Sequence, residues 1–188
     1  ACDLRYGDER VNEPSRLLDH PSIEVMELGF DQRPGESFLD SLQSFQEAAD
    51  AARTYLIDNY RQYPFMYAKA YRRIFDRLLA DDRIVIHCTA GKDRAGMASA
   101  MVLTALGVSK GVVLSDYLLT NEYWDRGGRE RPDMDADTVA MIFAAREEYF
   151  DAAFAGIGER YESLDEYLTA EVGLTATDRA RLREMYLE

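Results

Sequence analysis

The segment from Ile84 to Leu106 constrains the fold of this chain more than any other. It holds an apolar run, Ile84-Val85-Ile86, then a short loop, His87 to Arg94, and then a helix-like run that starts near Met97. The apolar run is typical of a strand buried on both faces, as in a parallel sheet covered by helices. A strand, a tight loop and a helix start gather successive backbone N–H groups around an anion, and the helix end adds partial positive charge. The segment therefore predicts an oxyanion-binding loop at the carboxyl end of a central strand.

The remaining pattern favours an α/β domain whose mostly parallel sheet is flanked by helices. Further strands are predicted at Cys2 to Arg5 and at Ile23 to Phe30. The predicted helices make the C-terminal half helix-rich; they cover residues 38–56, 64–78 with Pro64 at the start, 97–106, 109–119, 137–156, 163–172 and 177–187. We expect a single domain over residues 1–188, a length that allows a genuine core.

Two residues of the loop carry its chemistry. Cys88 and Arg94 stand six positions apart. A helix N-terminus and neighbouring cations favour the thiolate form of a cysteine, which is the nucleophilic form. An arginine offers a planar fork that binds two phosphate oxygens at once. We predict that Cys88 is the nucleophile and Arg94 the phosphate clamp of an enzyme that forms a phosphocysteine.

The other loop residues support this interpretation. Gly91 permits a positive φ and a close approach of the phosphate. The predicted phosphate-binding residues are Cys88, Thr89, Ala90, Gly91, Lys92, Asp93 and Arg94. His87 either orients the thiolate through a hydrogen bond or is a satisfied core histidine, and the sequence leaves both readings open.

The run His-Cys-x-Ala-Gly-Lys-Asp-Arg-x-Gly resembles the signature of the cysteine-dependent tyrosine phosphatases, in particular their bacterial and fungal branch. Asp3-Leu4-Arg5 resembles a strand of that branch, Asp116 to Asn121 a downstream motif, and Tyr161 to Leu187 the C-terminal helices. The resemblance covers nearly the whole chain and is weakest at Arg126 to Asp137. This family usually has several dozen residues before the Asp-Leu-Arg strand, so we expect the N-terminal portion of the domain to be missing.

The resemblance implies a metal-independent phosphomonoesterase without a cofactor. Its substrates would be phosphotyrosine proteins, together with phosphoserine, phosphothreonine or phosphoinositides, and inorganic phosphate or another oxyanion would occupy the loop. Phosphoinositide phosphatases often carry a loop lysine, so Lys92 either binds a further phosphate of an inositol ring or is a solvated lysine at a loop tip. The basic cluster Arg126, Arg129 and Arg131 contacts a second phosphate, belongs to a lid, or forms a solvated loop.

The general acid has two candidates. A loop aspartate is the acid in the branch that the chain resembles, and Asp93 matches it. Lys92 and Arg94 beside Asp93 favour its ionised form, which opposes this role. Asp31, on the turn after the second predicted strand, is the alternative. Asp3 reaches the loop from the first strand, where we expect it to orient the cations of the loop.

One position departs from the family. Ser or Thr normally follows the arginine, where the hydroxyl assists the thiolate as it leaves the phosphocysteine, and this chain has Ala95. Loss of one hydrogen bond to a charged group costs about 1.5–3 kcal/mol, or roughly one to two decades in rate. Ala95 therefore predicts a slow second step. The alternative is a catalytically weakened module that binds phosphate.

Composition limits the partners. The net charge is −13, and residues 122–188 carry 17 acidic and 8 basic side chains. Such a surface repels nucleic acid and anionic membranes, and no apolar run approaches the roughly 20 residues of a membrane span. With two histidines, His20 and His87, we expect no metal site. Cys2 and Cys88 form no disulfide framework, so we expect a cytoplasmic protein, or one exported with a leader outside this sequence.

Overall fold

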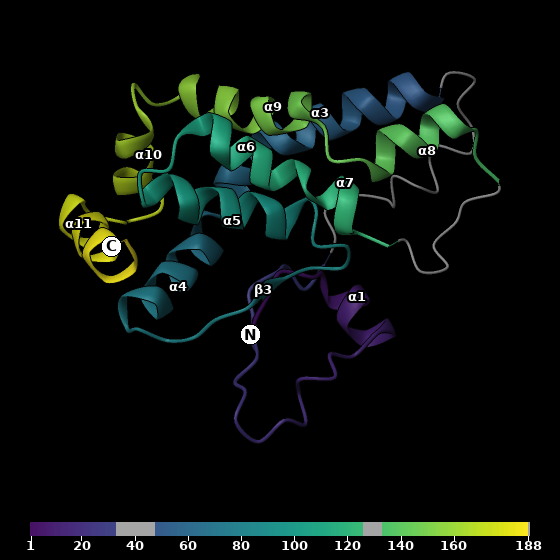
Figure 1. The fold of residues 1–188 in the computed structure, drawn as a ribbon. Coiled ribbons are helices and arrows are strands. Elements are labelled where there is room, and N and C mark those ends of the chain that lie inside the picture. Colours follow the sequence, from purple (N-terminus) through teal and green to yellow (C-terminus); the bar gives the residue numbers. More distant parts are fainter. Residues whose placement is uncertain (33–47, 126–132, 188) are drawn as a thin grey trace.

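The computed structural model describes residues 1–32, 48–125 and 133–187 (Figure 1). Its sheet has three parallel strands in the order β2-β1-β3, namely β1 (Cys2–Asp3), β2 (Met26–Glu27) and β3 (Ile86–His87). Cys2 pairs with Met26 on one side and with Ile86 on the other. The predicted α/β class with a parallel sheet is therefore confirmed.

The place of the third strand needs a correction. Among the described residues β1, and not β3, is the central strand. The prediction that Ile84 to Ile86 is buried on both faces is also wrong, because Val85 is 51% exposed. Ile84 and Ile86 pack against the core while Val85 points away from it. The run is apolar at all three positions, but only one face of the strand is buried, because alternate side chains of a strand face opposite sides.

Helices form most of the described structure, and Figure 1 shows α3, α5, α6 and α9 in one layer, with the strands and α1 below it. The helices are α1 (Gly7–Asn12), α3 (Ala48–Met66), α4 (Ala68–Leu79), α5 (Arg94–Ala105), α6 (Lys110–Leu118), α7 (Thr120–Tyr123), α8 (Ala136–Phe143), α9 (Glu147–Gly158), α10 (Leu164–Ala170) and α11 (Ala176–Tyr186). Within the described ranges, none of them is long and apolar enough to cross a membrane.

Two predicted helices differ in the structure. Pro64 does not start a helix but lies in the last turn of α3, and α4 begins after Tyr67. The helix predicted over residues 137–156 is two helices, α8 and α9. The side-chain amide of Asn121 explains the break, because it donates to the carbonyl of Ala145 and accepts from its N–H, both at 2.8 Å. The first part of the helix predicted over residues 38–56 lies outside the described residues.

Side chains cap the starts of α10 and α11. Ser163 caps α10 by accepting the N–H of Glu166 at 3.1 Å. Thr175 and Asp178 form a reciprocal capping box at α11. These side chains satisfy N–H groups that have no partner within the helix.

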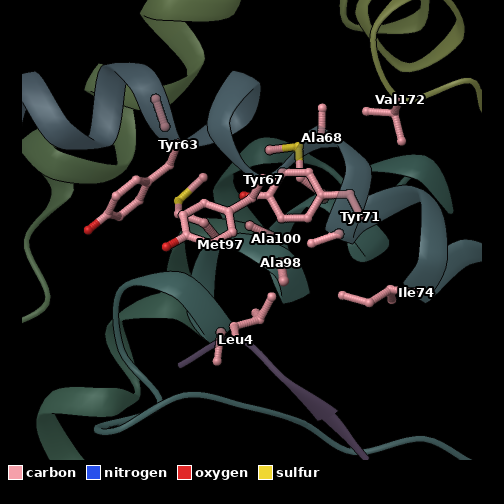
Figure 2. Close-up of a cluster of buried hydrophobic side chains, with 14 of the residues drawn as sticks. Leu4, Tyr63, Tyr67, Ala68, Tyr71, Ile74, Met97, Ala98, Ala100 and Val172 are labelled. Carbon is pink, nitrogen blue, oxygen red and sulfur yellow. The ribbon is translucent and has the colours of Figure 1, made fainter. Parts of the chain in front are cut away.

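The core is dominated by aromatic side chains that pack around α5. Met97 and Met101 of α5 are fully buried. Figure 2 shows Met97, Ala98 and Ala100 near Tyr67, Tyr71 and Leu4. This packing places α5, and with it the loop before α5, at the side of the helix layer that faces the sheet.

Tyr71 gives a test of this packing, because its buried hydroxyl has no hydrogen-bond partner among the described residues. Tyr71→Phe should raise the free energy of unfolding by about 1 kcal/mol, since it removes an unsatisfied polar atom and keeps the ring. Tyr167→Phe is the matched control: the Tyr167 hydroxyl donates to the Pro64 carbonyl at 2.7 Å, so its loss should destabilise the protein. Urea unfolding of both variants measures the difference, and a destabilised Tyr71→Phe would contradict this account.

Candidate active site

The loop between β3 and α5 lies beside the end of β1. The N–H of Leu4 donates to the His87 carbonyl at 2.9 Å, so the first turn after β1 and the start of the loop are neighbours. Gly91 has a φ of +76°. This left-handed conformation favours glycine, as its place in the loop predicted. Cys88 is buried and carries a free thiol.

Arg94, the first residue of α5, is held by a carboxylate from α1. Its Nη1 and Nη2 donate to Glu9 Oε2 at 2.5 Å and to Glu9 Oε1 at 2.8 Å. Nη1 also lies 3.3 Å from the Leu4 carbonyl, and the guanidinium carbon lies 4.8 Å from the centroid of the Tyr6 ring. None of the hydrogen bonds that Arg94 makes to described residues uses Nε. The bidentate pair therefore fixes the plane of the guanidinium and leaves its Nε edge for an oxyanion.

Glu9 is a site residue that the sequence did not reveal. It also accepts the Thr89 hydroxyl at 2.5 Å and the N–H of Tyr6 at 2.8 Å. Burial alone would raise the pKa of Glu9, but the hydrogen bonds and charge of Arg94, with the bond from Thr89, outweigh it and lower the pKa to about 2. No local pattern connects Glu9 to a loop 80 positions further along the chain.

The pairing also affects Arg94. Burial alone would lower the pKa of Arg94, yet the hydrogen bonds that Arg94 donates to Glu9 and the negative charges of Cys88 and Glu9 raise it. Arg94 is therefore a permanent cation in the site.

Asp93 faces the helix layer. Its Oδ1 accepts the Tyr60 hydroxyl of α3 at 2.7 Å and lies 3.2 Å from Lys92 Nζ. The Tyr60 hydroxyl in turn lies 2.7 Å from the Tyr117 hydroxyl of α6. Tyr60 and Tyr117 were not predicted as site residues. The sequence showed only that each lies in an apolar helical pattern, which does not indicate a place in the site.

Lys92 is buried, with 2% of its surface exposed. Its Nζ donates to the Ile142 carbonyl at 2.5 Å and to the Ala144 carbonyl at 3.4 Å, at the end of α8. The alternative of a solvated lysine at a loop tip is therefore wrong. A cation at the C-terminal end of a helix is also favourable for the helix dipole.

Asp31 lies beside Arg10 of α1. Its side chain is 97% exposed and pairs with Arg10 at 3.2 Å. Arg10 also donates to the Arg5 carbonyl. The structure does not join Asp31 to the loop, whereas Asp93 is part of it.

Asp3 and His87 lie next to one another beneath the loop. Asp3 holds Arg5 through bonds of 3.0 Å and 2.7 Å, so the cation that it orients is Arg5 and not one of the loop. Burial would raise the pKa of Asp3, but the Arg5 bonds outweigh it and lower the pKa. His87 Nε2 lies 3.9 Å from Asp3 Oδ2 and has no hydrogen bond to a described residue, while Nδ1 lies 3.4 Å from the Cys88 carbonyl. The structure thus shows neither a His87 bond to the thiol nor a fully satisfied histidine.

The basic cluster Arg126, Arg129 and Arg131 lies outside the described residues. Within the part of the chain that the structure describes, no group of three His, Cys, Asp or Glu side chains is arranged to hold a metal ion. The candidate site is therefore the loop, Glu9 of α1, Tyr60 of α3 and Tyr117 of α6.

A cysteine and an arginine on one loop between a parallel strand and a buried helix are the arrangement typical of the cysteine-dependent phosphatases. The chain belongs to the tyrosine phosphatase family, whose model matches residues 1–188. It is 33% identical over 167 residues to the triple specificity protein phosphatase PtpB of Mycobacterium tuberculosis. The aligned region covers 79% of this chain and 60% of that protein.

Two other relatives are more distant. A putative tyrosine-protein phosphatase of Cupriavidus necator is 27% identical over 161 residues, or 81% of this chain and 58% of that protein. A tyrosine-protein phosphatase of Nostoc commune is 25% identical over 123 residues, or 64% of this chain and 40% of that protein. The chain thus spans 60% or less of the length of these relatives.

Proposed function

We propose that the chain hydrolyses phosphate monoesters, phosphotyrosine proteins first among them, without a metal. The thiolate of Cys88 attacks phosphorus, the bond from phosphorus to the ester oxygen breaks, and Asp93 gives its proton to that oxygen. The loop N–H groups and Arg94 hold the other three oxygens. Water then attacks the phosphorus of the phosphocysteine and gives a proton to Asp93. The bond from sulfur to phosphorus breaks, so that phosphate is released and the thiolate is restored.

The observation that carries this proposal is the arginine of the loop, which Glu9 orients and which shares the loop with Cys88. A rigid guanidinium can match the equatorial oxygens of a phosphoryl group as it transfers. The acid role of Asp93 is supported by its place on the loop, whereas Asp31 is exposed and bound to Arg10.

The intermediate tests the proposal directly. The protein is mixed with 4-nitrophenyl phosphate in EDTA, quenched in acid within milliseconds, digested and analysed by mass spectrometry. We expect the mass of one phosphoryl group on the peptide that contains Cys88. Turnover that EDTA abolishes, or phosphate found on another residue, would overturn the mechanism.

Wider substrate use is a further part of the proposal. The Mycobacterium tuberculosis relative is named for triple specificity, which motivates tests with phosphoserine, phosphothreonine and phosphoinositides. The sequence suggested Lys92 as the contact for an additional phosphate, but here Lys92 is bound to the end of α8. An inositide would need either a displaced Lys92 or a different cation, so we place phosphotyrosine first.

Ala95 decides between an efficient enzyme and a weak one. Ala95 is buried and follows Arg94 in the chain, and it has no hydroxyl to stabilise the departing thiolate. Stopped-flow measurements should show a burst of nitrophenol followed by a slow steady rate in the wild type. Ala95→Ser should raise the steady rate roughly tenfold and remove the burst, because one hydrogen bond to a charged group is restored.

The outcomes separate the two candidate functions. A wild type without a burst would contradict the role given to Ala95. Negligible turnover together with tight binding of phosphate would favour the alternative function, a phosphate-binding module.

A further inference from the structure

The side chain of Asp93 does not do what its position favours. Asp93 is the N-cap residue of α5, and aspartate is among the best N-cap residues because its carboxylate accepts the first free N–H groups. Here the side chain makes no cap hydrogen bond. Its Oδ1 instead accepts the Tyr60 hydroxyl at 2.7 Å and lies 3.2 Å from Lys92 Nζ. A local preference that is overridden in this way points to a functional constraint.

The Tyr60 bond is the end of a directional chain. A tyrosine hydroxyl has one proton to donate. Tyr60 gives its proton to Asp93, so the bond of 2.7 Å between Tyr60 and Tyr117 must be donated by Tyr117. The chain therefore runs from Tyr117 through Tyr60 to Asp93, and both hydroxyl donors in it point toward the carboxylate.

Packing keeps this chain rigid and dry. Tyr60 is fully buried, and its ring centroid lies 5.0 Å from that of Tyr63 and 5.5 Å from that of Tyr149. Burial and the negative charge of Asp93 raise the pKa of Tyr60 well above its ordinary value, so Tyr60 stays a donor throughout the working pH range. The charged groups near Asp93 are Lys92 and Arg94, and the titratable groups packed against it are Tyr60, Tyr63, Tyr117 and Tyr149.

The geometry makes the two oxygens of Asp93 unequal. Oδ1 is an acceptor in both protonation states of the carboxyl group, because Tyr60 always donates to it. A proton on Asp93 is therefore carried by Oδ2, for which no described residue provides a hydrogen bond. We propose that Tyr60, supported by Tyr117, is a positioning residue that fixes Asp93 so that Oδ2 delivers the proton to the leaving oxygen.

This inference rests on the proposed function, in which Asp93 is the general acid. In the step concerned the bond from sulfur to phosphorus forms, the bond from phosphorus to the ester oxygen breaks, and the proton moves from Oδ2 to that oxygen. Tyr60 keeps its own proton. Removal of the Tyr60 hydroxyl should therefore lower the rate only for substrates whose leaving group needs protonation.

Tyr60→Phe tests this with two substrates. We compare kcat/KM, which reports the first chemical step even when phosphocysteine hydrolysis is slow. Phenyl phosphate needs a proton for its leaving group, and 2,4-dinitrophenyl phosphate does not. Tyr60→Phe should lower kcat/KM about tenfold for phenyl phosphate and less than about twofold for the dinitrophenyl ester, the size expected for one hydrogen bond to a charged group.

A double-mutant cycle shows whether Tyr60 acts through Asp93. Asp93→Asn should lower kcat/KM for phenyl phosphate by about tenfold or more. In that background Tyr60→Phe should have no further effect on this leaving-group selectivity, because the group that Tyr60 positions is already gone. Tyr63→Phe is the matched control on the same helix: its ring touches Tyr60, but its hydroxyl makes no hydrogen bond to Asp93, so both substrates should change less than about twofold.

Each outcome decides a separate point. Equal losses of Tyr60→Phe on both substrates, or a full additional loss in the Asp93→Asn background, would overturn the positioning role. If Tyr60→Phe does not fold, Tyr117→Phe replaces it, with an expected loss of about threefold confined to phenyl phosphate; equal losses on both substrates overturn the idea again. Failure of the proposed function itself would appear differently, as wild-type turnover that does not depend on Cys88.

Discussion

Cys88→Ser should lower kcat for aryl phosphates by at least about four orders of magnitude, because a serine hydroxyl in this loop lacks the nucleophilicity of a thiolate and has no base to activate it. The loop N–H groups, Glu9 and Arg94 are unchanged by this substitution. We therefore expect the variant to keep its affinity for inorganic phosphate. Steady-state rates and calorimetric titration with phosphate measure the two properties separately.

The second cysteine supplies the control. Cys2 lies in β1, fully buried and without a place in the proposed reaction. Cys2→Ala should therefore leave the rate within about twofold, although it removes a core atom and lowers stability. Residual turnover of Cys88→Ser above a few per cent, or loss of phosphate binding with an intact fold, would contradict the assignment of the nucleophile.

Glu9→Gln should lower kcat/KM about 100-fold, although Glu9 has no direct part in the chemistry. Glutamine keeps the size of the side chain but removes the negative charge that orients the Arg94 guanidinium. Its amide NH2 group would also face the donors of Arg94 and Thr89, with which it cannot form the hydrogen bonds that the carboxylate accepts. A small misplacement of a transition-state contact is enough for a loss of this size. Breaking a partly buried ion pair should also destabilise the fold by about 2 kcal/mol, below the range for fully buried pairs.

The pH dependence of stability identifies the source of this effect. The pKa of Glu9 is lowered from 4.5 to about 2 in the folded protein, so the ionised form stabilises the fold. The difference in unfolding free energy between wild type and Glu9→Gln should be complete above about pH 4.5 and disappear as the pH falls toward 2. Asp8→Asn, an exposed neighbour on α1, should show little of this dependence. A difference that is constant with pH would show that the charge of Glu9 is not responsible.

Local patterns predicted the parts of the fold that depend on nearby residues. The loop and the positive φ of Gly91 both follow from signals within a few positions. The end of α8 does not, because the side chain that breaks the helix at Ala145 is Asn121, from another helix. Pro64 also misled, since a proline can lie in the last turn of a helix as well as the first.

The same division holds in the site. Cys88, Arg94 and Asp93 stand together in the sequence, so their grouping was visible. The pairs Glu9–Arg94 and Tyr60–Asp93 join residues 85 and 33 positions apart, and neither has a periodic pattern. Lys92 shows the reverse failure: a charged residue in a loop was expected at the surface or on a ligand, and the structure gives it helix carbonyls as partners.

The central position of β1 has a consequence for the order in which the protein folds. Its partners are β2 and the distant β3, and the arginine of the loop is held by Leu4 and Glu9 from the same end of the chain, 90 and 85 positions away. Contacts of this separation form slowly, because a long loop must close before they contribute, whereas helices form from local contacts. Single helices can therefore form while the loop still lacks its frame, and we expect the ability to bind an anion to be acquired late in folding. A refolding chain would gain its full helical signal before it could recognise phosphate.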